Sequence, residues 1–594
     1  MIGGFFQRSA LLLRVFVASA SIANLVAQAQ AAELTAIYSN GMEVPLTAAG
    51  YTATGNTVSF TLNYAPTPGT QLTVVNNTGL DFIQGVFDNL DNGAAVNLSY
   101  NGTTYSFVAW YYGGDGNNDL VLLWRDTGLA AWGKNNVGQL GDGNKKQRNV
   151  PRATDQGGVL AGKTIVQVAQ GSFHTLALTS EGKVYSWGEN ARGELGNKTN
   201  TSQSVPVAVD TTSGSALFGK TVVAIAASGH PYFGPAAHSL ALCSDGSLAA
   251  WGYNEYGQLG NSTTTNQNKP VPVSTDGGSA LAGKNVVSIA AGGFHTLALC
   301  SDGTVATWGW IYQSSIRTTP VAVSTVSGVS ALFGKTVTKI AAGNSSNLAL
   351  CSDGTMASWL FDAPEPVDMS GPLAGKTVTM IASGDSHKLV LCSDGTLAAW
   401  GKNAFGQLGD NTTTQRLTPV AVNQSGVLNG KIPISIAAGR EHSMVLCSDG
   451  SLAAWGLNVS GQLGNNTTTN STAPVLVSTA PGASVLAGKQ VSRIAKSMSF
   501  SDHALAIYGL QNTQVAVEHP LRNTLVDGAS VDFGATSLTG EGKEIIFTIR
   551  NTGPELLAWI NTTIEGAHAA EFSIPRRASY PVMRNAATIA ESDP

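Results

Sequence analysis

The stretch Gly283–Gly309, GKNVVSIAAGGFHTLALCSDGTVATWG, contains the pattern on which the fold depends. One apolar segment ends at Gly292, a second begins at His295, a Ser-Asp-Gly phrase follows, and a third segment ends at Trp308. Short segments with β-branched residues and no 3.6-residue period are typical of strands. Asp-Gly tolerates the positive φ angles of tight hairpin turns, so we expect the second segment to fold back on the third.

The same phrases return about every 54 residues along the chain. Most copies add a Gly-Gln-Leu-Gly or Gly-Glu-Leu-Gly phrase and a Pro-Val segment, which makes four expected strands per copy, the size of one β-propeller blade. The repeated tryptophans are Trp132, Trp187, Trp251, Trp308, Trp359, Trp400 and Trp455. The repeated histidines are His174, His238, His295, His387, His442 and His503, with Ser346 in the remaining slot.

The two ends of the repeat region complete each other. The segment Gly128–Trp132 has a tryptophan strand without its histidine partner, and His503–Ile507 has a histidine strand without its tryptophan partner. Pairing them produces a seventh unit and removes the exposed sheet edges that an open array would have to protect. The sequence therefore predicts an all-β fold with a closed seven-bladed β-propeller over residues 125–509.

The combination of Ala-x-Gly-x-x-His-x-Leu-Ala-Leu, Trp-Gly and Gly-Gln-Leu-Gly resembles the regulator of chromosome condensation repeat. The Gly-[Gln/Glu]-Leu-Gly phrase is missing after Trp308 and Trp359, so two blades depart from the pattern there. The resemblance implies a propeller whose family members serve as protein-binding platforms, and it leaves the partner open.

The segments outside the propeller lack its repeat pattern. Residues 1–31 combine Arg8 and Arg14 with an apolar run and Ala29-Gln30-Ala31, which predicts a signal peptide and hence export to the cell surface or outside the cell; an amphipathic helix is the alternative. No other run reaches the ~18 apolar residues of a membrane-spanning helix, so we expect no membrane span in the mature chain.

Residues 33–124 form a β-rich segment that resembles strand-repeat modules of bacterial autotransporters and surface proteins, through phrases such as LTVVNNTG at 72–79 and YGGDGNNDLVL at 112–122. Residues 113–120 also resemble one copy of a calcium-binding repeat. Because such sites need stacked copies, a plain loop is the preferred interpretation.

Residues 511–575 resemble immunoglobulin-like modules named after abnormal-spindle and hydin proteins, on VDFG at 531–534 and IFTIRNTG at 546–553. The sequence therefore predicts a partial β-sandwich there, with truncation of the module as the alternative. Residues 576–594 are a tail unlike that module.

Composition excludes several classes of protein. Charged residues are 12% of the chain, about half of the ~25% usual in globular proteins, and the net charge is −5. A generally basic nucleic-acid binder is excluded by this charge, and a disordered polyelectrolyte by the 43% hydrophobic content. We therefore expect no nucleic-acid partner. We also expect the chain to be a monomer.

The cysteines and histidines sit at repeated positions. Five cysteines each precede a Ser-Asp-Gly turn, at 243, 300, 351, 392 and 447. Equivalent positions ~10 Å from a seven-fold axis lie ~9 Å apart, beyond the ~7 Å between Cα atoms that a disulfide allows. We interpret the cysteines as small buried side chains, the histidines as hydrogen-bonding residues that tie blades together and the tryptophans as packing between blades, with metal or redox chemistry as the alternative.

Departures from the repeat nominate a binding patch. Extra residues occur in one copy after Gly229, in the next after Trp308 and in the third after Trp359, and strand polarity places all three on one rim. Exposed aromatic residues often mark binding sites, although drift in decaying repeats is an alternative. The candidate binding residues are His230, Tyr232, Phe233, Trp310, Tyr312 and Phe361.

The sequence nominates no catalytic or metal-binding residues and no cofactor, because it has no Gly-x-Ser-x-Gly, His-Glu-x-x-His or P-loop motif. We expect an exported, non-catalytic propeller that binds a protein or a glycan. The alternatives by resemblance are guanine-nucleotide exchange and inhibition of a β-lactamase. The plant ultraviolet-B photoreceptor relies on Trp in Gly-Trp-Arg-His-Thr, which is absent from the matching stretches 171–175 and 292–296, so photoreception is not expected.

Overall fold

The structure is a computed structural model that describes residues 32–510, except 231–235, 313–314, 345, 360–362 and 496–500, together with four short strands nearer the C-terminus. Nearly all of its regular elements are strands, and the described part contains one 3₁₀ turn, η1 (Gly371–Leu373). Within the described residues, no helix is long and apolar enough to cross a membrane.

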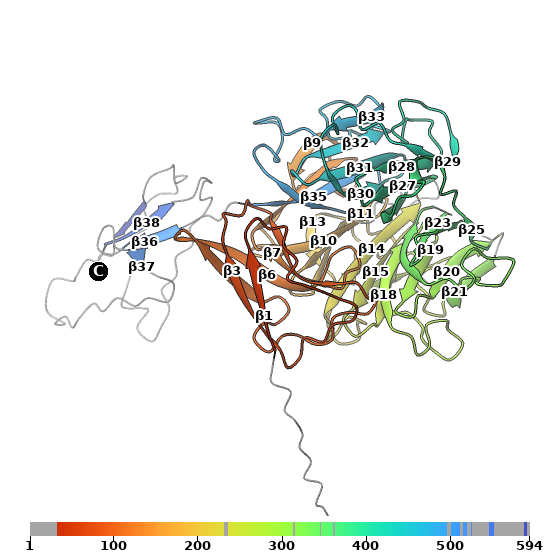
Figure 1. Cartoon of the computed structure of the whole chain (residues 1–594), viewed down its shortest axis with the longest axis horizontal. Coiled ribbons are helices and arrows are strands. Elements are labelled where there is room, and N and C mark those ends of the chain that lie inside the picture. The colour runs from red at the N-terminus through yellow and green to blue at the C-terminus, as the bar shows by residue number, and fades with distance from the viewer. Residues whose placement is uncertain are drawn as a thin grey trace, which may run out of the picture.

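Residues 33–124 form a separate N-terminal module, drawn in red in Figure 1. Its five-stranded sheet has the order β2 (Leu46–Ala48), β4 (Gln71–Asn77), β7 (Asp119–Trp124), β6 (Thr103–Gly113) and β5 (Ala95–Tyr100). A second sheet pairs β1 (Glu33–Tyr38) with β3 (Thr57–Leu62) in parallel. Phe87, Phe107, Leu120 and Leu122 are among the residues of its own core.

Seven four-stranded sheets form the propeller, as the repeat predicts. Blade 1 contains β10 (Ile165–Gln170), β11 (His174–Thr179), β12 (Val184–Gly188) and β13 (Gln203–Ala208); blade 2 contains β14 (Val222–His230), β15 (Ala236–Cys243), β16 (Leu248–Gly252) and β17 (Gln267–Pro272); blade 3 contains β18 (Val286–Ala291), β19 (His295–Cys300), β20 (Val305–Tyr312) and β21 (Ser315–Ala322). Within each blade the strands pair in sequence order and antiparallel.

The next three blades repeat this order. Blade 4 contains β22 (Val337–Ala342), β23 (Asn347–Cys351), β24 (Met356–Trp359) and β25 (Glu365–Pro366); blade 5 contains β26 (Val378–Ser383), β27 (His387–Cys392), β28 (Leu397–Gly401) and β29 (Arg416–Ala421); blade 6 contains β30 (Pro433–Ala438), β31 (His442–Cys447), β32 (Leu452–Gly456) and β33 (Ser471–Leu476).

Blade 7 joins the two ends of the repeat region and confirms the predicted closure. It contains β34 (Val491–Ile494), β35 (His503–Gly509), β8 (Thr127–Gly133) and β9 (Arg148–Ala153). The antiparallel register runs from His503 opposite Gly133 to Gly509 opposite Thr127. Because β35 and β8 are far apart in sequence, their pairing fixes the ring as a closed structure.

The strand directions give the ring two different faces. The first and second strands of a blade, and the third and fourth, connect on one side, which we call the loop face. The Ser-Asp-Gly turns and the connections between blades lie on the other side, which we call the turn face. At one such turn, Gly246 has a φ of +78° and donates its N–H to the Cys243 carbonyl over 3.0 Å.

The N-terminal module packs on the turn face. Asn285, directly before β18, donates to the Asp81 carboxylate over 3.0 Å, and Thr67 donates to the Gln490 side chain, directly before β34, over 2.6 Å. Trp110, Val121 and Leu123 of the module are buried in one cluster with Val166 and Ile225 of the ring. The sequence did not predict this apolar interface.

The remaining described strands form a sheet of order β37 (Thr524–Leu525), β36 (Val515–Glu518), β38 (Ile546–Asn551) and β39 (Ala587–Ala590). Strand β39 comes from the residues predicted to be a tail. The rest of 511–594, the segment expected to form an immunoglobulin-like module and a tail, lies outside the described residues, as does the expected signal peptide at 1–31.

Candidate binding face

The repeated tryptophans are part of the joints between blades. All seven are at most 7% exposed. The indole N–H of Trp187 donates to the Gln139 carbonyl over 2.9 Å, in the Gly-Gln-Leu-Gly phrase of the preceding blade, and Trp132 bonds Gln462 in the same way over 3.0 Å. Trp251, Trp308 and Trp455 make the equivalent bonds to Glu194, Gln258 and Gln407, each over 2.9 Å.

Five of the six repeated histidines also bond across blade junctions. Each imidazole Nε2 faces the side chain that follows the histidine slot in the next blade. The pairs are His174 with Ser239 at 2.8 Å, His238 with Thr296 at 3.0 Å, His295 with Asn347 at 2.6 Å, His387 with Ser443 at 3.0 Å and His503 with Thr175 at 3.0 Å. These imidazoles therefore form hydrogen bonds between neighbouring blades. The described residues contain no cluster of three acidic, His or Cys side chains that could hold a metal ion.

Two junctions depart from this scheme. His442 has no hydrogen-bond partner on either ring nitrogen, and the slot in the next blade holds Ala504. Between blades 4 and 5, Ser346 replaces the histidine and Lys388 fills the slot. Burial lowers the pKa of Lys388 to about 8.

The five cysteines are free and buried, as the sequence predicts. Burial raises the pKa of each thiol, that of Cys243 to about 11. A thiol with a raised pKa is a poor nucleophile, because the thiolate is the reactive form.

An aromatic cluster lies on the loop face between blades 2 and 3. It comprises Tyr253, Tyr256, Phe294 and Trp310. The rings of Tyr256 and Trp310 are stacked, with centroids 5.7 Å apart and planes at 24°, and Phe294 meets both rings from the side, at 4.9 and 5.7 Å. Phe294 and Tyr253 are buried, whereas Tyr256 and Trp310 remain half-buried.

The opposite part of the loop face is charged. Arg440 pairs with Asp502 at 2.8 Å and Lys402 pairs with Glu441 at 2.9 Å, and both carboxylates are nearly buried. Lys134 lies 3.7 Å from Asp502. The loop face is therefore divided into an aromatic part over blades 2 and 3 and an ion-paired part over blades 5 to 7.

Three of the six predicted patch residues lie on the loop face, and the other three lie outside the described residues. Trp310 belongs to the aromatic cluster. His230 and Tyr312 lie in strands that project as hairpins on the loop face, where His230 pairs with Ala236 and Tyr312 with Ser315. Tyr232, Phe233 and Phe361 lie outside the described residues.

Sequence reasoning missed Tyr253 and Tyr256 and treated Phe294 only as part of the repeat. A comparison of copies contains the signal. The position after Trp-Gly is Lys134, Glu189, Lys402 or Leu457 in the other copies that keep the Gly-[Gln/Glu]-Leu-Gly phrase, but Tyr253 in blade 2. Two tyrosines within four residues of that copy distinguish it from its neighbours.

Comparisons with known proteins cover the propeller. A family model described as RCC1-like domain matches residues 128–493. The human E3 ubiquitin-protein ligase HERC2 is 31% identical over 411 residues, 68% of this chain and 7% of that protein. The ultraviolet-B receptor UVR8 of Arabidopsis thaliana is 27% identical over 58% of this chain and 65% of that protein. The chain thus spans less than two thirds of either relative's length.

Two solved structures are similar in fold. Yeast RCC1 (Prp20), solved bound to Kap60, has 23% identity and a TM-score of 0.53, covering 65% of this chain and 90% of that one. Human WBSCR16 has 20% identity and a TM-score of 0.53, covering 65% of this chain and 99% of that one.

Proposed function

The chain belongs to the RCC1-like domain family, and we propose that it is a non-catalytic binding platform that captures a protein partner through the aromatic cluster of its loop face. We further propose that it acts outside the cell. The support for export is the N-terminal sequence, in which two arginines precede an apolar run and a small-x-small site.

The half-buried stack of Tyr256 and Trp310 is the observation on which the proposal rests. Residues that dominate protein interfaces are enriched in Trp, Tyr and Arg, and sit in well-packed positions surrounded by a polar rim. Arg192, whose guanidinium carbon is 6.0 Å from the centre of the Tyr253 ring, and Glu255, 3.7 Å from Arg192, supply charged neighbours. Tyr253 and Phe294 hold the stack from below, so binding would cost little side-chain entropy.

The position of the N-terminal module also favours the loop face as the binding surface. The module packs on the turn face through buried Trp110, Val121 and Leu123, and so reduces the surface that the turn face offers to a partner. The loop face carries the projecting β14–β15 and β20–β21 hairpins beside the aromatic cluster. A partner would therefore meet the ring from the loop face.

The test is affinity capture from the host's extracellular fraction with the full chain as bait. We expect Trp310→Ala and Tyr256→Ala each to reduce capture at least tenfold, since loss of a central aromatic contact costs about 2 kcal/mol or more. The matched control is Val459→Ala, which removes an apolar side chain 59% exposed on the loop face of blade 6. Equal capture by the control and the aromatic variants would refute the proposed site.

The same reagents distinguish the other functions. A glycan partner would survive protease treatment of the captured fraction and be lost on deglycosylation. Nucleotide release from a small GTPase, or inhibition of a β-lactamase, by the purified chain would replace the proposal with one of the alternatives. Immunodetection in cell fractions tests export separately: retention of the chain in the cytoplasm would contradict it and leave the binding face untouched.

A further inference from the structure

One set of equivalent positions that line the central channel of the propeller varies between blades. The first strand of each blade sheet lies nearest the channel. The third residue of each of these strands lines one cavity of about 780 Å³ at the turn face. These seven residues are Gln167, Ala224, Ser288, Lys339, Met380, Ser435 and Arg493. Trp and His recur at blade joints, whereas this set of seven includes apolar, polar and charged side chains. Its composition is therefore not dictated by the joints.

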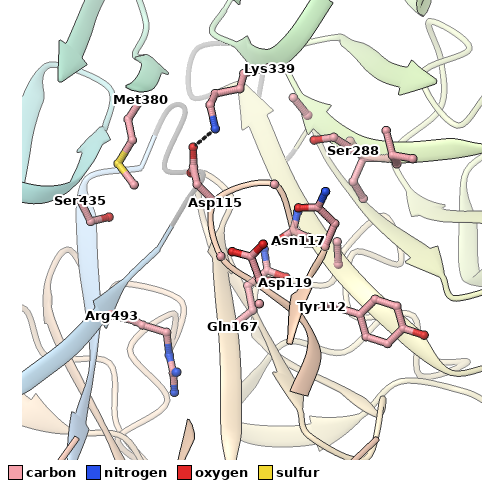
Figure 2. A pocket seen from close by; sticks show the side chains of 18 of the residues that line it. Tyr112, Asp115, Asn117, Asp119, Gln167, Ser288, Lys339, Met380, Ser435 and Arg493 are labelled. Carbon is pink, nitrogen blue, oxygen red and sulfur yellow. Dashed lines mark hydrogen bonds and ion pairs between the residues drawn. The ribbon is translucent and has the colours of Figure 1, made fainter. Parts of the chain in front are cut away.

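A loop of the N-terminal module enters this end of the channel. Residues 113–119 connect β6 to β7 and line the cavity, and we call them the plug loop. Asp115 of the plug loop pairs with Lys339 of blade 4. Figure 2 shows Lys339 and Arg493 on different sides of this loop. The plug loop thus contacts Lys339, one of the two cationic side chains among these seven residues; Arg493 is the other.

Four charged side chains line the cavity, namely Asp115, Asp119, Lys339 and Arg493. Asp119 is turned toward its own loop: one carboxylate oxygen accepts the Asn77 N–H over 2.8 Å, and the other lies where a Cβ on Gly114 would be only 1.9 Å away. Asp115 is committed to Lys339. The carboxylates of the plug loop are therefore engaged elsewhere than at Arg493.

Among the described residues, the guanidinium of Arg493 makes one hydrogen bond. One terminal nitrogen donates to the Ile165 carbonyl over 3.1 Å, while Nε is buried without a partner. In the part of the chain that the structure describes, no carboxylate lies within 4.0 Å of the guanidinium. Burial lowers the Arg493 pKa to about 10, which still leaves the side chain charged at neutral pH. A half-buried guanidinium with an unpartnered Nε is the kind of group that binds a carboxylate.

The wall beside Arg493 is mostly apolar. Met380, Ile381, Ile434 and Ile436 line the cavity on blades 5 and 6, and Ile434 is 43% exposed. A cavity of this volume is within the ~300–1,000 Å³ of ligand sites that combine apolar walls with a few polar groups. The exposed Ile434 marks a place where the apolar wall is open to solvent.

We propose that this cavity binds a small amphipathic carboxylate, with the carboxylate on Arg493 and the apolar body against Met380 and the isoleucines of blades 5 and 6. A single negative charge matches the single unpaired cation. A dianionic phosphate would add excess negative charge beside Asp119. This site is on the turn face and is independent of the partner proposed for the loop face.

The experiment is calorimetric titration of the full chain with octanoate, octanol and octylamine below their aggregation concentrations. We expect octanoate to bind at least about tenfold more tightly than octanol, because hydrogen bonds to a charged group are the stronger kind, and octylamine to bind most weakly. Octanoate binding no tighter than that of octanol, or no binding of octanoate, would overturn the proposal.

Variants locate the site. Arg493→Met should weaken octanoate at least about tenfold and leave octanol unchanged, and Arg493→Lys should retain part of the preference. Ile434→Asp, at an exposed position, should weaken both ligands. The wild-type comparison of octanoate with octanol stands even where Arg493→Met fails to fold. Unchanged octanoate binding in a folded Arg493→Met chain would place the ligand elsewhere and refute the assignment.

Discussion

Ala504 is paired in register with Trp132 at the strand junction that closes the propeller. In the other blades, the residue paired with the tryptophan is Thr175, Ser239, Thr296, Asn347, Lys388 or Ser443. The hydroxyl of Thr175, for example, donates to the Gln139 carbonyl over 2.9 Å and faces His503 of the preceding blade at 3.0 Å. Ala504 has no hydroxyl, and His442 of the preceding blade is left without a partner.

Ala504→Ser should therefore stabilise the ring. The new hydroxyl would donate to the Gln462 carbonyl and accept from His442 Nε2, which removes a buried unsatisfied nitrogen. A gain of about 1 kcal/mol in the free energy of unfolding is expected, measured as a higher urea midpoint. Ala504→Cys is the matched control, since it adds similar bulk but a weak hydrogen-bonding group. Equal effects of Ser and Cys would show that added packing is responsible.

The stability of the ring should fall as the pH is lowered through the ordinary range of histidine. Burial lowers the pKa of all six repeated histidines, His442 to about 4 and His174 to about 3. The unfolded chain takes up protons near pH 6.5 and the folded chain does not, so the stability is complete above pH 6.5 and declines toward pH 3. Each histidine contributes roughly 1.4 kcal/mol per pH unit between pH 6.5 and its own pKa in the folded chain.

Urea unfolding between pH 7.5 and 4.5 checks this dependence. His387→Gln removes one titrating group while keeping a donor for Ser443, and should reduce the slope. A free energy of unfolding that stays constant down to pH 4.5 would contradict the prediction, since the carboxylates alone would then explain acid denaturation.

Glu194 gives the opposite pH dependence. It occupies the slot that holds Gln139, Gln258, Gln407 and Gln462 in other blades, and burial raises its pKa to about 8. Because the folded pKa lies above the unfolded value, the contribution to stability is complete below about pH 4.3 and is lost as the pH rises through 8. Glu194→Gln should remove this loss and raise the urea midpoint at pH 8.5 more than at pH 5. Gln258→Glu is the reciprocal control and should introduce the same alkaline weakness.

The sequence was sufficient to predict the ring because the fold repeats. Seven tryptophan strands and the two incomplete ends, around Trp132 and His503, determined blade number and closure, and the structure confirms both. Each repeat contains its own hairpin signal, so local pattern and global fold agree.

The N-terminal module's position could not be derived in the same way, since it depends on two surfaces that appear once each. A signal was nevertheless present in β7. Its run Leu120–Trp124 is continuously apolar, which is typical of a strand buried on both faces. Leu120 and Leu122 face the module core, while Val121 and Leu123 face the ring. The cavity beside the plug loop is formed by this docking, so the sequence did not predict it either.

The docking of the module should depend on Val121. The side chain is fully buried in the cluster shared with Val166 and Ile225 of the ring, so an aspartate there would be an unpaired buried charge. Such a charge costs about 3 kcal/mol or more, enough to separate the module from the turn face in Val121→Asp. The ring itself should persist, because the pairing of β35 with β8 closes it without the module. Hydrogen exchange should then accelerate in β6 and β7 while β11 and β19 remain protected.

Thr61→Asp, on an exposed position of β3, is the control and should leave exchange unchanged. Protection of β7 in Val121→Asp equal to that in the wild type would show that the interface is held by its polar contacts, such as those of Asp81 and Thr67, rather than by its apolar core.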